Sequence, residues 1–408
     1  TGNSFFFVLL DNKHKIQVMN NFTFYSPTEF LFGKNVELQV AELIKKQGAT
    51  NVLLVFGGGS IFRSGLLDRI EDILESANIP FSRLGGIQPN PIDEKVYQGI
   101  ELCRKDKIDL ILAIGGGSVI DTAKAIAVGA PYQGDFWDFF EGKAVPQSAL
   151  KVGVVLTIPA AGSEGSGNSV ITKVSTLQKL SLRTPELLRP VFSIMNPELT
   201  YTLSNYQTAV GVVDMMAHIM ERYFSNTEEV ELTNSLCEAT LRVIRDEALR
   251  VKDDPEHYGA RANIMWSGTL AHNGLLGVGR EEDWASHFME HEISALYGVA
   301  HGAGLAVVFP AWMTYAVDHN VDKLVQYAVK VWNIPEEGDK KEIALQGIDA
   351  LKSFLVSIGM PTTFSDLGIK DPDIDEMVTR LHQNKGAIIG NYIPLSATET
   401  RAIYELMK

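Results

Sequence analysis

Three of the nine histidines lie in one short stretch, WASHFMEHEISALYGVAH, which spans residues 284–301. His287 and His291 are four residues apart in a helical pattern, so both side chains are expected on one face of a helix. Gly298 is expected to end that helix, and His301 then lies at the start of the next one. Imidazoles gathered in this way suit a metal ion or a proton relay.

A second pair of this kind lies upstream, where Asp214 and His218 are also four residues apart in a predicted helix. The residues around them are methionine and isoleucine, so the pair is expected to face protein, where a buried carboxylate needs compensation. One carboxylate with two or three imidazoles suits Zn²⁺ or Fe²⁺. The spacing predicts a metal site without deciding its last member: Asp214, His218, His287 and either His291 or His301. The remaining histidine could then carry protons, while His272 is interpreted as structural or as a neighbour of the ligands.

The elements that must position these residues fall into two groups. In the first half, three apolar runs, at 51–56, 109–114 and 152–160, read as buried strands that each lead into a Gly-rich turn. This rhythm predicts a Rossmann-like α/β domain with a mainly parallel sheet over residues 19–199. The later segments are long and amphipathic, which predicts an all-helical domain over residues 200–408. Residues 1–18 do not fit either pattern and are interpreted as an extension or cloning remnant.

Two of the turns read GGGS, and the second opens a predicted helix. Glycines let backbone N–H groups approach an anion closely, and the N-terminus of a helix carries a partial positive charge. We therefore expect this turn to bind the pyrophosphate of a dinucleotide, with Asp121 and Lys124 orienting the loop or reaching the ligand. The residues of the turn are Gly115, Gly116, Gly117 and Ser118. A tight turn that binds nothing is the alternative, because neither turn matches GxGxxG or the P-loop.

The first GGGS turn bears on the choice of dinucleotide. Many dinucleotide folds place an acidic side chain near such a strand end, where it holds the adenosine ribose. Here the position is occupied by Gly57, Gly58 and Gly59, with Ser60 and Arg63 nearby. Without a carboxylate there is no repulsion against a 2′-phosphate, and a guanidinium could pair with it. We therefore predict NADP(H) over NAD(H), although Arg63 could equally be a solvated helix charge.

Charge, hydropathy and cysteine content bear on the partners and the compartment of the protein. The net charge of −14 argues against nucleic acid or an anionic membrane surface as the main partner. The apolar run Phe5–Leu10 is too short to span a bilayer and lacks the flanks of a signal peptide. Cys103 and Cys237 form no metal-binding or redox motif, so they are interpreted as inert thiols in a reducing cytoplasm.

Several of these segments resemble the iron-containing (group III) alcohol dehydrogenases. The matching motifs are GGGSVIDTAKAIA, TIPAAGSE, DMMAHIMERY and HFMEHE followed by AHGAGLA. The segments NFTFYSPTEFLFG, FGGGS and GGIQPNP are most similar to the branch of NADPH-dependent butanol dehydrogenases and broad-specificity aldehyde reductases. The resemblance covers residues 19–408 and implies the two-domain, dehydroquinate synthase-like superfold. The loop that is often GTGSE-like in the family reads AGSEGSG here.

The resemblance also implies roles for individual residues. It implies that the metal ligands are Asp214, His218, His287 and His301. His291 then matches a histidine that lies near the nicotinamide and the substrate without binding the metal. Family members that prefer NAD tend to have aspartate at the position of Gly57. The implied cofactor contacts are Gly57, Gly58, Ser60, Asn90, Gly116, Gly117, Ser118, Asp121, Thr157, Ser163 and Lys179.

The activity expected from these features is metal-assisted hydride transfer between NADP(H) and short to medium aliphatic alcohols or aldehydes. His291 is the expected proton relay. Four aromatic side chains could form an apolar wall that selects aliphatic substrates, or could belong to the core. They are Phe136, Trp137, Phe140 and Trp284. The chain is expected to form a homodimer. The alternatives are a polyol or glycerol dehydrogenase, a lyase of the same superfold, or a catalytically silent nucleotide-binding protein. Fe²⁺ and Zn²⁺ suit the same ligands.

Overall fold

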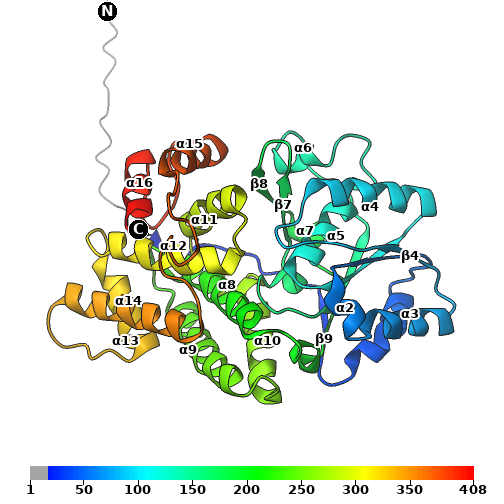
Figure 1. The fold of residues 1–408 in the computed structure, drawn as a ribbon, viewed down its shortest axis with the longest axis horizontal. Coiled ribbons are helices and arrows are strands. Elements are labelled where there is room, and N and C mark those ends of the chain that lie inside the picture. Colours follow the sequence, from blue (N-terminus) through cyan, green and yellow to red (C-terminus); the bar gives the residue numbers. More distant parts are fainter. Residues whose placement is uncertain (1–16) are drawn as a thin grey trace, which may run out of the picture.

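The structure is a computed structural model that describes residues 17–408 (Figure 1). A six-stranded parallel sheet and its helices form one half of the molecule, and a helical region forms the other. The strand order is β2-β9-β6-β5-β3-β4. In that order, the strands are Glu29–Phe32, Phe192–Met195, Lys151–Leu156, Leu110–Gly115, Val52–Phe56 and Phe81–Leu84. The predicted parallel sheet is confirmed, since every pair of neighbouring strands runs parallel.

The central strands are buried on both faces, which explains their continuous apolar runs. Leu53 and Ile111 point to one core cluster, whereas Leu54 and Leu112 point to the other. Helices α1 (Val40–Lys46) and α3 (Leu66–Ser76) contribute residues to the cluster that contains Leu54 and Leu112. The short helix α2 (Gly59–Arg63) lies between them in the sequence. Helices α4 (Asp93–Asp106), α5 (Gly117–Gly129) and α6 (Trp137–Phe140) contribute residues to the cluster that contains Leu53 and Ile111. The aromatic residues Phe136, Trp137 and Phe140 are buried in that cluster and thus belong to the core.

An antiparallel hairpin extends from the sheet half toward the helices. Its strands are β7 (Asn168–Lys173) and β8 (Gln178–Arg183), which the short helix α7 (Pro185–Leu188) follows. β8 contacts α11 (Ala285–Tyr297), and Figure 1 shows the hairpin lying between the two halves. The hairpin therefore brings side chains of the sheet half into contact with the helix that carries His287 and His291.

The second half is helical, as the periodicity predicts, and shares one apolar core. Besides α11 its helices are α8 (Asn205–Tyr223), α9 (Glu231–Asp253), α10 (Tyr258–His272), α12 (His301–Ala316), α13 (Val321–Trp332), α14 (Lys340–Ser357), α15 (Ile374–Lys385) and α16 (Ala397–Glu405). Helix α8 begins with a capping box in which Ser204 and Gln207 satisfy each other's backbone N–H groups. The predicted boundary between residues 199 and 200 falls within a 3₁₀ turn, Pro197–Thr200.

One short strand departs from the all-helical expectation for residues 200–408, and its partner lies in the leader. Gln17–Val18, at the end of the leader assigned to residues 1–18, forms β1 and pairs in parallel with β10 (Thr227–Glu228). These two leader residues therefore contribute to the fold. The apolar run at residues 5–10 lies outside the described residues. Between residues 17 and 408, no helix has the length and apolar character needed to cross a bilayer. Cys103 and Cys237 are both free and buried.

Candidate active site

Three helices of the second half converge on one point, and each carries a predicted ligand. Asp214 lies on α8, His287 on α11, and His301 is the first residue of α12. Gly298 ends α11 with a φ of 67°, a left-handed conformation that glycine adopts without strain, so the predicted helix boundary is confirmed. At Gly302, a Cβ atom would lie 2.1 Å from the carbonyl oxygen of Val210. Glycine at this position therefore permits the close approach of α12 to α8.

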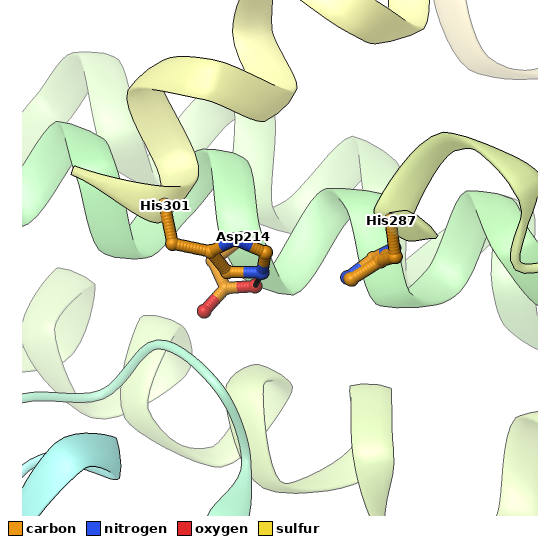
Figure 2. Close-up of side chains that lie close together, drawn as sticks. All are labelled: Asp214, His287 and His301. Carbon is orange, nitrogen blue, oxygen red and sulfur yellow. Dashed lines mark ion pairs between the residues drawn. The ribbon is translucent and has the colours of Figure 1, made fainter. Parts of the chain in front are cut away.

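The side chains of Asp214, His287 and His301 form a compact cluster. One potential ligand atom from each lies within 4.8 Å of the others. Figure 2 shows His287 and His301 extending from separate helices toward the carboxylate of Asp214. The Nε2 atom of His301 lies 3.7 Å from Asp214 Oδ1. An oxygen and two imidazole nitrogens thus face one another from three different elements.

Two polar atoms in this cluster are buried without a hydrogen bond. Asp214 Oδ1 and His287 Nε2 have no hydrogen-bond partner among residues 17–408. Each such atom costs about 1–3 kcal/mol, so a native site is expected to offer it a partner. A cation bound between a carboxylate oxygen and imidazole nitrogens would satisfy both atoms. The donor set fits Fe²⁺ or Zn²⁺.

The protonation states suit metal binding. Burial raises the pKa of Asp214 to about 6, against the attraction of His301. Burial, and then the neighbouring imidazole of His301, lowers the pKa of His287 well below its usual value. Burial and the proximity of His287 have the same effect on the pKa of His218. Neutral imidazoles keep the lone pair that a metal needs.

A buried carboxylate accounts for the orientation of His287. Glu221, on α8, accepts hydrogen bonds at Oε1 from the backbone N–H of His287 at 2.9 Å and from its Nδ1 at 2.7 Å. Its Oε2 accepts the backbone N–H of Trp284 at 2.8 Å. Glu221 therefore caps the start of α11 and leaves Nε2 of His287 free to face Asp214. This kind of carboxylate–histidine pair commonly orients metal ligands.

His218 contacts the cluster from one side. Its Nδ1 lies 3.4 Å from Asp214 Oδ1, but His218 is not among the three residues whose ligand atoms all lie within 4.8 Å. Its ring lies 4.1 Å from that of His272, measured between centroids. His272 is hydrogen-bonded through Nδ1 to Arg222 at 3.1 Å and through Nε2 to Asn168 at 3.0 Å. His272 thus packs beside a predicted ligand, in line with its predicted structural role.

His291 is buried on the same helix as His287. Its ring centroid lies 5.6 Å from that of His301, and its Nδ1 has no hydrogen-bond partner within the described chain. Burial, and then the charge of Lys179, lowers the pKa of His291 well below its usual value. A second possible metal cluster consists of Glu290, His291 and His301. It shares His301 with the first cluster, and the Nδ1 atom of His301 is already paired with Glu290.

The Gly-rich turns lie at one edge of the sheet. They follow β3 and β5, and Thr157 follows β6; these three strands are neighbours, so their carboxyl ends meet. Gly58, Gly59, Ser60 and Arg63 are exposed, and the guanidinium of Arg63 lies over Gly59. This edge is where an α/β sheet of this type binds its ligands.

The second turn is closely packed. A Cβ atom at Gly116 would lie 2.9 Å from the Cβ of Ile158, and one at Gly117 would lie 3.0 Å from that of Ala161. At Gly115 the obstacle is the side chain of Val119, at 2.6 Å. Internal packing alone thus accounts for these glycines, and their contact with a cofactor stays a prediction.

Asp121 and Lys124 hold the loop that follows β6. Asp121 accepts the hydroxyl of Ser163 at 2.6 Å and the backbone N–H of Val170 at 2.9 Å. Lys124 is fully buried and donates to the carbonyl oxygens of Ser163, Ser166 and Asn168 at 2.6–3.0 Å. Of the two roles that the sequence suggests, the structure favours the orientation of the loop.

Asn90 and Lys179 join the two halves of the molecule. Lys179, on β8, donates to Asn90 Oδ1 at 3.0 Å and to the hydroxyl of Ser294 at 3.3 Å. The side-chain amide of Asn90 donates to the carbonyl oxygen of Val299 at 3.2 Å. These two predicted cofactor residues therefore lie against α11 and the turn after it, close to the histidine cluster.

Two further residues of the site, Glu221 and Glu290, stand out in no sequence motif. Both are fully buried and each is paired with a histidine of the cluster. A signal was present: Glu221 follows His218 by three residues and Glu290 follows His287 by three, a spacing that shares a helical face. Their partners, however, lie on other helices, which spacing cannot identify.

Comparisons with known proteins agree with this arrangement. The model of the iron-containing alcohol dehydrogenase family matches residues 27–197, and that of the family's C-terminal region matches residues 208–407. A probable NADH-dependent butanol dehydrogenase 2 of Bacillus subtilis is 42% identical over 94% of this chain and 99% of its own. The NADPH-dependent aldehyde reductase YqhD of Escherichia coli is 36% identical over 95% and 99%.

A solved structure gives the same picture of the fold. The NADH-dependent butanol dehydrogenase A of Thermotoga maritima superposes with a TM-score of 0.92 at 40% identity, over 96% of this chain and 99% of the other. The likeness thus extends over both halves and includes the helices that bear the histidine cluster. The chain belongs to the iron-containing alcohol dehydrogenase family, in its butanol dehydrogenase and aldehyde reductase branch, and is an oxidoreductase of that kind.

Proposed function

We propose that this protein is a metal-dependent, NADP(H)-linked alcohol dehydrogenase or aldehyde reductase that acts on short to medium aliphatic substrates. The observation that carries the proposal is the cluster of Asp214, His287 and His301, with its two buried atoms that lack hydrogen bonds within the described chain. The printed names of similar proteins, butanol dehydrogenase and aldehyde reductase, support the substrate class. We also propose that the protein is cytoplasmic and homodimeric, by its family.

In this proposal the metal is held by Asp214, His218, His287 and His301. When bound, the ion supplies a Lewis acid that polarises the oxygen of the alcohol or aldehyde. Asp214 offsets part of the cation's charge, and Glu221 keeps the Nδ1 proton of His287 away from the metal side. Fe²⁺ and Zn²⁺ both fit these donors.

The nucleotide is proposed to bind along the edge formed by the Gly-rich turns. Its nicotinamide ring supplies or accepts the hydride. The residues proposed to contact it are Gly57, Gly58, Gly59, Ser60, Arg63, Asn90, Gly115, Gly116, Gly117, Ser118, Asp121, Thr157, Ser163 and Lys179. His291 is proposed to pass the proton that accompanies hydride transfer, because it is buried beside His301 and its Nδ1 lacks a hydrogen-bond partner in residues 17–408.

The choice between NADPH and NADH depends on Gly57. Two similar proteins at 36–42% identity carry different cofactors in their names, NADH in one and NADPH in the other. Gly57 offers no carboxylate to repel a 2′-phosphate, and Arg63 provides a cation in the next helix. A Cβ atom at Gly57 would lie 3.4 Å from the carbonyl oxygen of Ile87, so a side chain can be accommodated there.

Replacing Gly57 by aspartate tests this assignment. We expect Gly57→Asp to shift the ratio of kcat/KM for NADPH to that for NADH at least about tenfold toward NADH, because an added carboxylate repels the 2′-phosphate. The ratio cancels any general loss of activity. An unchanged ratio would show that the 2′-phosphate does not approach this turn.

The experiment that tests the function uses metal-free protein reconstituted separately with Fe²⁺ and Zn²⁺. Oxidation of NADPH and of NADH is then followed with butanal as substrate. Metal-dependent turnover supports the proposed reductase. Turnover with glycerol or another polyol but not with butanal would favour a polyol dehydrogenase. No turnover with either metal or nucleotide would favour a silent nucleotide-binding protein.

A further inference from the structure

Glu290 is a buried carboxylate that none of the roles above requires. It lies on α11, is 0% exposed, and points toward the start of α12. One oxygen, Oε2, is paired with Nδ1 of His301, and the other accepts the hydroxyl of Ser294. The ammonium group of Lys179 lies 3.8 Å from Oε2 and offsets the buried charge. Carboxylates are rarely buried this deeply without such compensation.

The pairing determines which nitrogen of His301 is available. A carboxylate accepts, so the Nδ1 atom of a neutral His301 carries the proton and Nε2 keeps the lone pair. Nε2 is also the atom that faces Asp214 Oδ1, at 3.7 Å. The hydrogen bond to Glu290 therefore fixes both the orientation and the tautomer of the His301 ring.

The surrounding helix leaves room for this carboxylate. At Gly304, on α12, a Cβ atom would lie 2.6 Å from Oε1 and 2.8 Å from Cγ of Glu290. Any larger residue at position 304 would push the carboxylate aside. Glycine there gives a second, independent means of disturbing the pair.

We propose that Glu290 is a positioning residue for the metal centre, which holds His301 so that its Nε2 atom points at the metal beside Asp214. This inference rests on the proposed function, because it assumes that His301 is a ligand. Outer carboxylates of this kind tune metal affinity by about 10–100-fold, through ligand orientation and basicity. The carboxylate of Glu290 also lies 3.8 Å from the ammonium group of Lys179, which comes from the hairpin of the sheet half.

The neighbouring Glu292 provides a matched control. It is equally buried on α11, but its carboxylate binds Arg380 and Asn384 of α15, each at 2.9 Å, instead of a histidine. The change Glu292→Gln removes the same charge from the same helix without touching the cluster. A loss specific to Glu290 therefore cannot come from general damage to α11.

The test compares full-length wild type, Glu290→Gln, Glu290→Ala and Glu292→Gln. Thermal unfolding of the metal-free proteins first establishes which variants fold. The dissociation constant for Zn²⁺ is then measured by competition with a chromophoric chelator, and the visible spectrum of the Co²⁺-loaded proteins reports ligand geometry. We expect Glu290→Gln to weaken Zn²⁺ binding about tenfold and Glu290→Ala up to about 100-fold. Both should alter the Co²⁺ spectrum, and Glu292→Gln should match wild type in both measurements.

Gly304→Ala keeps the carboxylate but displaces it, and it should also weaken Zn²⁺ binding. If Glu290→Ala does not fold, Gly304→Ala and Glu290→Gln together still test the proposal. Wild-type affinity and spectrum in the Glu290 variants would overturn the proposal, and so would an equal loss in Glu292→Gln. If wild type binds no stoichiometric Zn²⁺, Fe²⁺ or Co²⁺, the metal centre itself is wrong, and the proposed function fails with it. If wild type binds metal but the Glu290 variants bind it equally well, only this inference fails.

Discussion

Within the described chain, two histidines of the cluster have a hydrogen-bond partner at only one of their two ring nitrogens. His287 and His301 each have Nδ1 paired with a buried carboxylate, while the Nε2 atoms face Asp214. A solely structural histidine would use both nitrogens, as His272 does with Arg222 and Asn168. This asymmetry sets His287 and His301 apart from His272, and it does not depend on family resemblance.

The two histidines on α11 should therefore respond differently to replacement. We expect His287→Ala to lose bound metal and activity, because its Nε2 belongs to the cluster. We expect His291→Ala to keep the metal but lose about 10²-fold or more in kcat, because it would remove only a proton relay. Metal content by elemental analysis and steady-state kinetics with butanal measure both effects, with the exposed His319→Ala as control. Loss of metal in His291→Ala but not in His301→Ala would reverse these assignments.

Residue types and local spacing predicted the histidine pairs and the start of α12 at His301. They could not choose between His291 and His301, because both follow His287 at short range. The contacts that bear on that choice, such as the pairing of His301 with Glu290, join different helices. The same limit explains why Glu221 received no role, since its partner His287 lies 66 residues away.

Helices α8 and α12 can approach each other closely because the residue of α12 at their contact is a glycine, which has no side chain. Gly302 lies against the carbonyl oxygen of Val210, so the first turn of α12 can bring His301 to Asp214 on α8. The sequence predicted both helices from their periodicity but gave no sign of this contact. Strands β3, β5 and β6 were predicted because a parallel sheet buried on both faces leaves long apolar runs.

Gly302→Ala should force the two helices apart. Overpacking of this kind typically costs about 1–3 kcal/mol, and here it also moves a proposed ligand. We expect a lower midpoint of thermal unfolding and weaker Zn²⁺ binding. Gly298→Ala is the control, because a Cβ atom there meets nothing within 4 Å and its cost is backbone strain alone. Equal losses of Zn²⁺ affinity in the two variants would contradict a specific role for the contact with Val210.

Helix α5 fixes the loop after β6 through Lys124, and this contact should depend on pH. Burial lowers the pKa of Lys124 to about 8 from its ordinary value of 10.5, against the attraction of Asp121. Between these values the unfolded chain binds the proton and the folded chain does not, so the free energy of unfolding rises with pH. We expect the difference between wild type and Lys124→Met to change by about 1.4 kcal/mol per pH unit in favour of wild type. Urea unfolding at pH 8 and 10 measures it, and a constant difference would contradict the assignment.

The molecule as a whole joins a sheet half and a helical half at the centre. Lys179 and Asn90 reach from the sheet half to Ser294 and Val299, beside the histidine cluster. These hydrogen bonds join the loop after β4 and the hairpin strand β8 to α11 and the turn that follows it. The Gly-rich turns belong to the sheet half and the histidine cluster to the helical half, so the proposed nucleotide and the proposed metal would be held by different halves.

Removal of the metal should therefore lower the stability of the whole folded chain. The proposed ligands come from three helices that share one apolar core, so a bound ion stabilises the folded chain and has no equivalent site in the unfolded one. At a free metal concentration 100 times the dissociation constant, the gain in the free energy of unfolding is about 2.7 kcal/mol. We expect chelation to lower the midpoint of thermal unfolding, and Zn²⁺ or Fe²⁺ to restore it. His287→Ala should show no response to either ion. A wild-type midpoint that ignores chelator and metal alike would mean that the cluster binds neither.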